Sequence, residues 1–165
     1  FEPEMTNKDS DLYRAHPDWI LHTPGRNASH GRYQYVLDFS RKEVVEYIYE
    51  MMAKILSEAK VSYIKWDMNR SITECYSVAL PADRQGEVFH RYILGVYDLY
   101  ERLTSEFPEV LFESCSSGGG RFDPGMLYYA PQGWTSDDSD AIERLKIQYG
   151  IIRYSEKPRY IPEQT

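Results

Sequence analysis

The stretch Val61–Arg70, VSYIKWDMNR, decides the fold because it places a carboxylate where a short strand gives way to a loop. Its first half is mostly apolar and follows a helical pattern, which indicates a strand that ends near Asp67. In parallel α/β barrels the carboxyl ends of the strands carry the chemistry, because each strand fixes the backbone while the next loop opens to substrate. Asp67 is therefore the first candidate for a functional residue.

Lys65 and Asn69 flank this aspartate at intervals of two residues. In a strand they share its face, so that a cation, a carboxylate and an amide converge on one pocket. We expect Lys65 to keep Asp67 ionised, as a nucleophile must be. An arbitrary Lys-x-Asp pair is more often a surface ion pair, and only the rest of the chain favours a functional site.

Two long amphipathic patterns surround this stretch. Ser40 is predicted to cap a helix over residues 41–59, with Glu43 as its capping-box partner. A second helix is predicted over residues 86–107, and a short strand follows at residues 110–112. The predicted buried face of the first helix consists of Val44, Val45, Ile48, Met51, Met52 and Ile55. The predicted buried face of the second consists of Phe89, Ile93, Val96, Tyr97, Tyr100, Leu103 and Phe107.

The order strand, helix, strand, helix, strand, helix predicts parallel strands joined by helical crossovers. A further strand end is expected at residues 33–39, and Phe1-Glu2 is expected to be the end of an earlier strand. A complete barrel takes about 250 residues, whereas the chain has 165. We therefore predict an α/β fold, a partial (β/α)8 TIM barrel with roughly half of its strands present.

The composition excludes several classes of function. A net charge of −7 without a cluster of basic residues argues against nucleic acid and anionic membranes as partners. No apolar run approaches the roughly 20 residues of a membrane helix. Cys75 and Cys115 lack the spacing of a disulfide framework, which indicates reduced thiols and a cytoplasmic protein.

Neither a cofactor nor a metal is expected. The glycine-rich run 116–120 lacks the dinucleotide pattern, and the histidine and cysteine spacings fit no metal-ligand pattern. A cysteine nucleophile at Cys115 is disfavoured because none of the four histidines lies in a recognisable partner motif. The glycines instead allow close backbone approach, and the 15 tyrosines suit a carbohydrate ligand or a packed barrel equally well.

A second group of carboxylates, Asp137, Asp138 and Asp140, precedes a predicted helix over residues 141–149. Two carboxylates from different strands can cleave a glycosidic bond, and in a retaining hydrolase they lie about 5 to 5.5 Å apart. Asp137 is nearest the strand side, so we predict it to be the acid, kept protonated in a drier neighbourhood. Asp138 and Asp140 are predicted to cap the helix, and capping is also the competing interpretation of the whole group.

Three motifs identify the chain as similar to a known family. KWDMNR at Lys65–Arg70, CSSGGGRFDPGMLYY at Cys115–Tyr129 and WTSDDSDAIERLKIQYG at Trp134–Gly150 closely resemble the family 36 glycoside hydrolases, the microbial α-galactosidases. FEPEM, SDLYRAHPDW and GRYQYVLDFSRKEV resemble the same family. The resemblance implies retaining hydrolysis of terminal α-D-galactosyl residues from melibiose or raffinose, with Asp67 as nucleophile and Asp137 as acid/base. It implies a galactose subsite lined by Arg32, Lys65, Asn69, Cys115 and Gly118.

The resemblance divides the chain into a partial catalytic barrel, residues 1–150, and a divergent tail, residues 151–165. The family's other sugar-binding carboxylates belong to strands before Phe1, so we expect the isolated chain to be inactive and the full-length parent to be a homo-oligomer. Two alternatives stay open. The same barrel serves α-N-acetylgalactosaminidases and galactosyltransferases, and the chain could instead be a non-catalytic barrel remnant.

Overall fold

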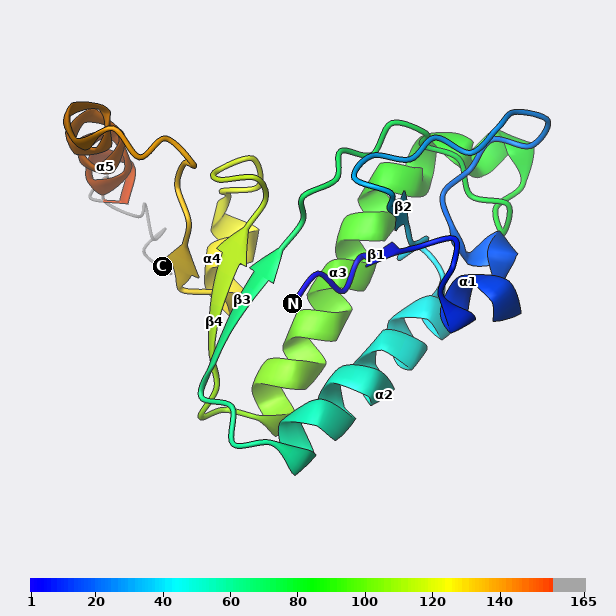
Figure 1. Ribbon diagram of the computed structural model, residues 1–165, viewed down its shortest axis with the longest axis horizontal. Coiled ribbons are helices and arrows are strands. Elements are labelled where there is room, and N and C mark those ends of the chain that lie inside the picture. The colour runs from blue at the N-terminus through cyan, green and yellow to red at the C-terminus, as the bar shows by residue number, and fades with distance from the viewer. Residues whose placement is uncertain (156–165) are drawn as a thin grey trace, which may run out of the picture.

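The computed structural model describes residues 1–155, and a three-stranded parallel sheet lies at its centre. The register places Lys65 opposite Glu113 and Asp67 opposite Cys115. The predicted strand around Asp67 is thereby confirmed, and the strand predicted at 110–112 extends further, to Cys115. The strands, in spatial order, are β3 (Tyr63–Asp67), β4 (Leu111–Cys115) and β5 (Gln132–Gly133) (Figure 1).

Phe1 extends this sheet beyond its β3 edge. Its amino nitrogen donates to the Lys65 carbonyl at 2.9 Å, and the Asp67 amide donates to the Phe1 carbonyl at 2.9 Å. Two bonds from one residue to positions two apart on its neighbour follow the pattern of a parallel ladder. This pairing agrees with the expectation that a strand ends at Phe1-Glu2 and a loop follows.

The predicted long helices are confirmed within a few residues of their expected bounds. Figure 1 shows α2 and α3 running side by side, with α5 projecting away from them. Among residues 1–155, no helix is long and apolar enough to cross a membrane. The predicted tail, residues 151–165, lies outside the described residues except for 151–155, which continue α5. The helices are α1 (Asp11–Ala15), α2 (Lys42–Glu58), α3 (Val88–Glu106), α4 (Pro124–Tyr129) and α5 (Ala141–Ser155), with short 3-10 helices at η1 (Pro17–Trp19) and η2 (Ala82–Glu87).

A second, smaller sheet departs from the expected run of parallel strands. It consists of β1 (Met5–Thr6) and β2 (Tyr35–Val36), which pair antiparallel. The intervening loop turns the chain back, so that the Leu37 amide also donates to the Glu4 carbonyl at 2.9 Å. The strand end expected at residues 33–39 therefore exists, but it belongs to this two-stranded ribbon and not to the parallel sheet.

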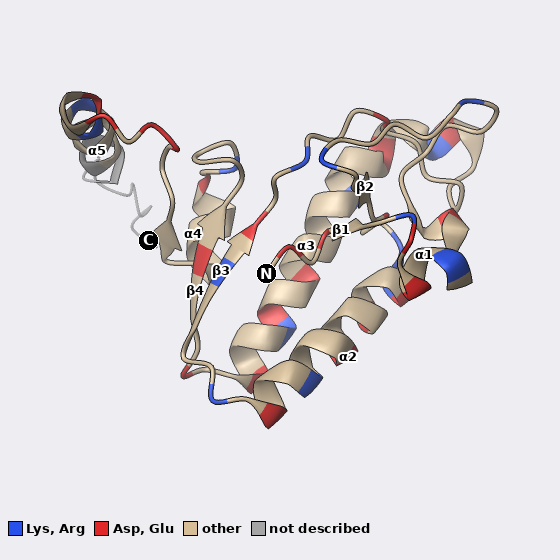
Figure 2. Ribbon diagram, viewed as in Figure 1, with Lys and Arg blue, Asp and Glu red and all other residues tan. Residues whose placement is uncertain are grey.

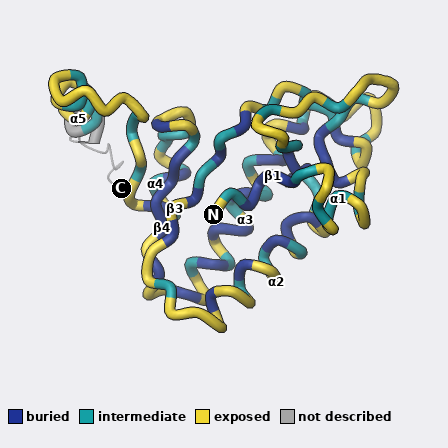
Figure 3. Tube along the Cα trace, in the orientation of Figure 1, coloured by how far each residue is buried: buried dark blue, intermediate teal, exposed yellow. Residues whose placement is uncertain are grey.

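The buried faces of α2 and α3 differ in part from the predicted ones. In α2, Met51 and Ile55 are 40% and 45% exposed, because the helix packs mainly on α3 and buries a narrower stripe. In α3, Phe89 is 53% exposed, whereas Tyr92 and Leu99, absent from the predicted face, are buried. α3 lies between α2 and the rest of the core (Figure 3). Its buried surface is therefore wider than the predicted face and is rotated around the helix axis relative to it.

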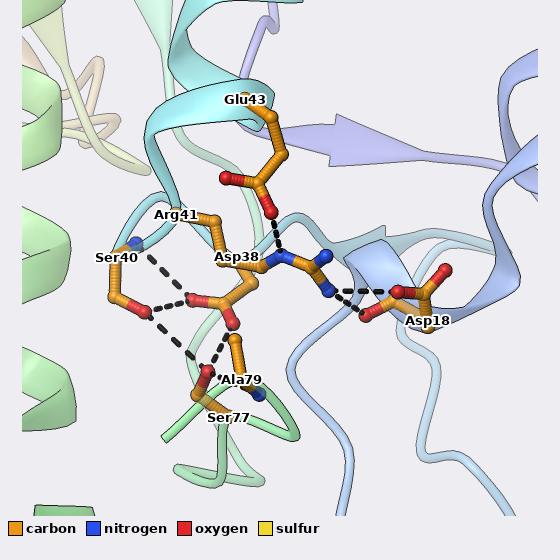
Figure 4. Close-up of polar contacts among 7 residues, drawn as sticks. All are labelled: Asp18, Asp38, Ser40, Arg41, Glu43, Ser77 and Ala79. Carbon is orange, nitrogen blue, oxygen red and sulfur yellow. Dashed lines mark hydrogen bonds and ion pairs between the residues drawn. The ribbon is translucent and has the colours of Figure 1, made fainter.

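The start of α2 is also built differently from the prediction. Arg41, not Ser40, is the N-cap residue, and no side chain caps the helix. The Ser40 hydroxyl donates instead to the buried Asp38 carboxylate at 2.5 Å (Figure 4). Glu43 accepts from Arg41 Nε at 2.7 Å, and the same guanidinium donates to the Asp18 carboxylate at 2.9 Å. Asp38 thus takes the Ser40 hydroxyl and Arg41 takes the Glu43 carboxylate, the two side-chain groups that a capping box would need.

The parallel sheet buries one face and leaves the other open. Ile64 and Trp66 of β3 point into the helical layer, where the Trp66 ring stacks on Tyr100 of α3 with centroids 4.1 Å apart. On the opposite face of the same strand, Tyr63 is 44% exposed and the Lys65 side chain 43%. Asp67 follows on this open face because side chains alternate along a strand.

Candidate active site

Asp67 lies at the carboxyl end of β3, at the edge where the sequence predicted chemistry. Its Oδ1 is buried and has no hydrogen-bond partner among the described residues. The backbone around it is held on both sides, because its amide donates to Phe1 and the next amide, of Met68, donates to the Cys115 carbonyl at 3.0 Å. The carboxylate thus has a fixed position and a free oxygen, as a group that attacks a substrate requires.

Cys115 occupies the matching end of β4 and is only 2% exposed. Burial raises the pKa of its thiol, and the nearby Asp67 carboxylate raises it further. A thiol in such surroundings is a poor nucleophile, since the thiolate is the reactive form. The burial and raised pKa of this thiol argue against Cys115 as a nucleophile, and its place in a sugar subsite stays a prediction.

Lys65 makes a different ion pair from the one expected. Its Nζ lies 3.9 Å from Glu113 Oε1 and 4.6 Å from the centroid of the Trp134 ring. Within the described residues its salt bridge is therefore with Glu113 and not with Asp67. The register explains the difference, because Lys65 on β3 and Glu113 on β4 lie directly opposite each other. Figure 2 shows positive and negative residues on these two adjacent strands.

Glu113 is a buried carboxylate that the sequence analysis missed. It accepts hydrogen bonds from the Tyr63 hydroxyl and from Gln132 Nε2, the latter at 2.7 Å. Partial desolvation of the hydroxyl, together with its hydrogen bond to Glu113, raises the pKa of the half-exposed Tyr63 to about 12. The alternation of Glu113 and Cys115 along β4 was the available signal, but the predicted strand ended before them.

Glu2, also missed, links two predicted sugar-binding residues. Its carboxylate accepts from Asn69 Nδ2 at 2.5 Å and Gln34 Nε2 at 2.7 Å, and Arg32 Nη1 lies 3.5 Å away. Burial raises the pKa of Glu2, but the hydrogen bonds from Gln34 and Asn69 outweigh it and the pKa is lowered. Arg32 has a φ of 53°, so its backbone is held in the left-handed region. Three segments therefore meet beside Asn69.

The loop that carries Arg32 is fastened from the segment after Asp67. Arg70 Nη2 donates to the Ser29 carbonyl at 2.7 Å. The Glu74 carboxylate accepts from the amides of Thr23 and Ser29 at 2.9 and 2.6 Å. The long loop predicted from the sequence is thus ordered by one acid and one base.

The glycine-rich turn after β4 packs directly on the segment that carries Asp137. A Cβ added to Gly118, whose φ is +84°, would lie 2.9 Å from Ser136 Cα and 3.1 Å from the Asp137 nitrogen. A Cβ at Gly119 would lie 2.6 Å from the Thr135 carbonyl oxygen. Gly118 therefore allows close backbone approach to the Asp137 segment, and its predicted contact with a sugar stays a prediction.

The three carboxylates of this segment have different partners. Asp140 Oδ1 accepts from the amides of Ile142 and Glu143 at 2.9 and 3.0 Å, which confirms Asp140 as a cap of α5. Asp138 accepts from the Asp140 amide at 2.9 Å and so braces the turn, not the helix. Asp137 accepts from Trp134 Nε1 at 2.9 Å, on the strand side, and takes no part in capping.

Asp137 nevertheless lies in a wetter place than expected. The sequence analysis assigned the acid to a drier neighbourhood, whereas Asp137 is exposed. The glycine-rich turn packs on the backbone at Asp137, while the carboxylate contacts Trp134 Nε1 and is otherwise open to solvent.

A small pocket of about 10 Å³, room for about one water molecule, lies at the glycine-rich turn, lined by residues that include Ser116, Arg121 and Met126. Of the predicted sugar-binding residues Gly118 alone lines it, and Asp67 does not, so we do not assign this pocket to the sugar. Among residues 1–155, no group of three or more histidine, cysteine or acidic side chains is placed to hold a metal ion. The chemistry available at the open sheet face is that of carboxylates, a lysine and amides.

Comparisons with known proteins agree on one family. Residues 1–155 match the family model described as Melibiase. The chain is 60% identical over 149 residues to α-galactosidase AgaA of Geobacillus stearothermophilus, covering 90% of this chain and 20% of that protein. It is 59% identical over 150 residues to α-galactosidase Mel36A of Lactobacillus acidophilus, covering 91% and 20%. The chain thus spans about a fifth of the length of these relatives.

Solved structures give the same result. The crystal structure of the GH36 α-galactosidase AgaA superposes with a TM-score of 0.87 at 60% identity, over 90% of this chain and 21% of that one. The α-galactosidase of Lactobacillus brevis gives 0.88 at 60% identity, over 92% and 20%. Variants of AgaA have been solved in complex with raffinose and with stachyose.

Proposed function

The chain belongs to the melibiase family, and from this we propose that it is the segment of a GH36 α-galactosidase that carries both catalytic aspartates. The observation that carries the proposal is the 60% identity to AgaA across 90% of the chain. The substrates we propose are oligosaccharides with terminal α-D-galactosyl residues, the class to which the raffinose and stachyose bound by AgaA variants belong.

The choice of Asp67 and Asp137 has support of its own. The AgaA variants solved with stachyose and with raffinose each replace one aspartate, by alanine and by asparagine respectively. Those two aspartates are separated along that chain by the same number of residues as Asp67 and Asp137 here. Replacement of a catalytic group is the usual way to keep a substrate intact during crystallisation, so the spacing supports both assignments.

We propose the following division of labour between them. Asp67 attacks the anomeric carbon with its free oxygen while Asp137 gives a proton to the leaving oxygen, which forms a covalent galactosyl-enzyme and releases the first product. Asp137 then takes a proton from water as the water attacks that intermediate, and Asp67 leaves as a carboxylate. Two inversions give net retention of configuration. Lys65, Asn69, Arg32, Cys115 and Gly118 are proposed to line the galactose subsite.

We further propose that the parallel sheet is part of a (β/α)8 barrel. Three parallel strands, the parallel bonding of Phe1 to the β3 edge and helices on one face support this architecture. The open face with Lys65 and Asp67 would then be the barrel interior. The two free cysteines, Cys75 and Cys115, support a cytoplasmic location, and a homo-oligomeric parent remains part of the same proposal.

A chimera tests the function with this chain's own residues. Residues 1–150 replace their counterpart in AgaA of Geobacillus stearothermophilus, and the product is assayed on raffinose and on 4-nitrophenyl α-galactoside. We expect hydrolysis of both substrates with retention of configuration. NMR of the first-formed sugar measures that configuration. A folded chimera that hydrolyses neither substrate would contradict the proposal.

Two matched controls separate the alternatives. The 2-acetamido analogue of the aryl galactoside distinguishes an α-N-acetylgalactosaminidase, which prefers it, from an α-galactosidase. Transfer of galactose to an added sugar in preference to water would instead indicate a galactosyltransferase. A folded chimera that binds raffinose without cleaving any glycoside would support the non-catalytic alternative.

A further inference from the structure

A buried ionic cluster lies behind the sheet, away from the open face. Glu4 is fully buried, and both of its oxygens accept from Arg121 Nη1, at 2.8 and 2.9 Å. Trp66 Nε1 donates to the same carboxylate at 2.8 Å, and the Tyr92 hydroxyl donates to it as well. The sequence analysis assigned no role to any of these four residues.

Arg121 and Glu4 form the ion pair at the centre of this cluster. Burial lowers the pKa of the Arg121 guanidinium, but the Glu4 carboxylate outweighs burial and raises it. Burial and the same carboxylate raise the pKa of Tyr92 well above its ordinary value. Arg121 Nε and Nη2 are buried without a partner among the described residues, so Glu4 is the anion that holds this guanidinium. Removal of one partner would leave the other charge buried and unpaired.

The cluster joins the two places from which the proposed catalytic aspartates project. Glu4 lies three residues after Phe1, and Trp66 immediately precedes Asp67. Arg121 ends the glycine-rich turn, in which the Gly120 amide donates to the Ser116 carbonyl at 3.3 Å. The glycine-rich turn also packs on backbone atoms of residues 135–137.

We propose that Glu4 and Arg121 are positioning residues for catalysis, which fix the glycine-rich turn so that it holds the Asp137 segment in place. This inference rests on the proposed function. Neither residue touches the substrate. Arg121 Nη1 donates to both Glu4 oxygens, and this charge-assisted contact ties the end of the turn to the buried carboxylate. A displacement of Asp137 by about 1 Å would cost roughly 100-fold in rate.

The experiment uses the same chimera with Arg121→Met, Glu4→Gln and the double variant. The matched control is Arg102→Met, which breaks a bidentate pair with Glu46 on exposed surfaces of α2 and α3. Each variant is assayed on raffinose, whose leaving group needs a proton, and on 4-nitrophenyl α-galactoside, whose leaving group needs little. Thermal unfolding of every variant is measured in parallel.

We expect Arg121→Met to lower kcat on raffinose by about 10 to 100-fold and kcat on the aryl galactoside by less than about threefold. A purely structural role would reduce both rates equally, through the fraction of folded enzyme. The double variant should lose no more than the worse single variant, because the two residues act as one unit. Arg102→Met should leave the ratio of the two rates unchanged.

Two outcomes overturn the inference: equal losses on both substrates, or single losses that multiply in the double variant. If Arg121→Met does not fold, Tyr92→Phe tests the inference in its place, because it removes one hydrogen bond to Glu4 and keeps the aromatic ring. It should lower the raffinose rate selectively by a few-fold, and an unchanged ratio would refute the positioning role. An unsubstituted chimera that folds but is inactive would instead contradict the proposed function itself.

Discussion

A single methyl group at Gly118 would perturb the predicted acid without touching its side chain. Gly118 has a φ of +84°, and an added Cβ would lie 2.9 Å from Ser136 Cα and 3.1 Å from the Asp137 nitrogen. Ordinary contact begins near 3.4 Å. Gly118→Ala therefore requires the segment before Asp137 to move by roughly 0.5 Å, since backbone atoms cannot swing aside as a flexible side chain can.

Two effects of this substitution have to be separated. A left-handed backbone costs an alanine about 1 to 2 kcal/mol in stability. Gly25→Ala is the matched control, because Gly25 has a φ of +80° and no atom within 4 Å of an added Cβ. Both variants should lose similar stability through backbone strain. Only Gly118→Ala should also lose activity, by about tenfold on raffinose if a full 1 Å displacement costs roughly 100-fold.

The assay compares both variants in the AgaA chimera by urea denaturation and by initial rates on raffinose and 4-nitrophenyl α-galactoside. We expect the loss for Gly118→Ala to be larger on raffinose, because a displaced acid matters most for a poor leaving group. Activity of Gly118→Ala within a factor of about two of Gly25→Ala on raffinose would refute the link between the turn and Asp137.

Three further predictions concern stability. Gly95→Ala should destabilise the fold by about 1 to 3 kcal/mol despite alanine's better helix propensity. The added Cβ would lie 1.9 Å from the Phe39 carbonyl oxygen. The control is Gly86→Ala, whose added Cβ has open space around it, and urea denaturation measures both variants. Asp140→Ala should cost about 1 kcal/mol and Asp140→Asn little, measured by hydrogen exchange at the start of α5. The raised pKa of Tyr63 predicts stability that is present below pH 10 and is lost as the pH rises toward about 12; Tyr63→Phe should flatten this loss, and an identical alkaline profile would contradict it.

The sequence predicted those features that local pattern determines. The end of β3 at Asp67 follows from a short apolar run before a polar loop, and the two long helices follow from apolar residues at helical spacing. Asp140 caps α5 because a cap depends only on the next turn of the chain. Asp137 was separated from the capping residues by the same local reasoning.

Features that depend on distant segments were not predictable in this way. β2 pairs with β1 because the long loop returns there, although its own alternation fits either sheet. Ser40 lost its predicted role because the buried Asp38 carboxylate takes its hydroxyl. The partner of Lys65 is Glu113 because the strand register sets them opposite each other, and no spacing along the chain encodes that register.

The measurement that tests the central claim most directly is chemical rescue of Asp67→Ala in the AgaA chimera. Removal of the nucleophile should lower turnover by several orders of magnitude, and added azide should restore part of it by attacking the anomeric carbon from the vacated side. Because this is one displacement and not two, the product should be the galactosyl azide of inverted, β, configuration. Near-normal turnover by Asp67→Ala without azide would show that Asp67 is not the nucleophile and that the site has been assigned to the wrong strand.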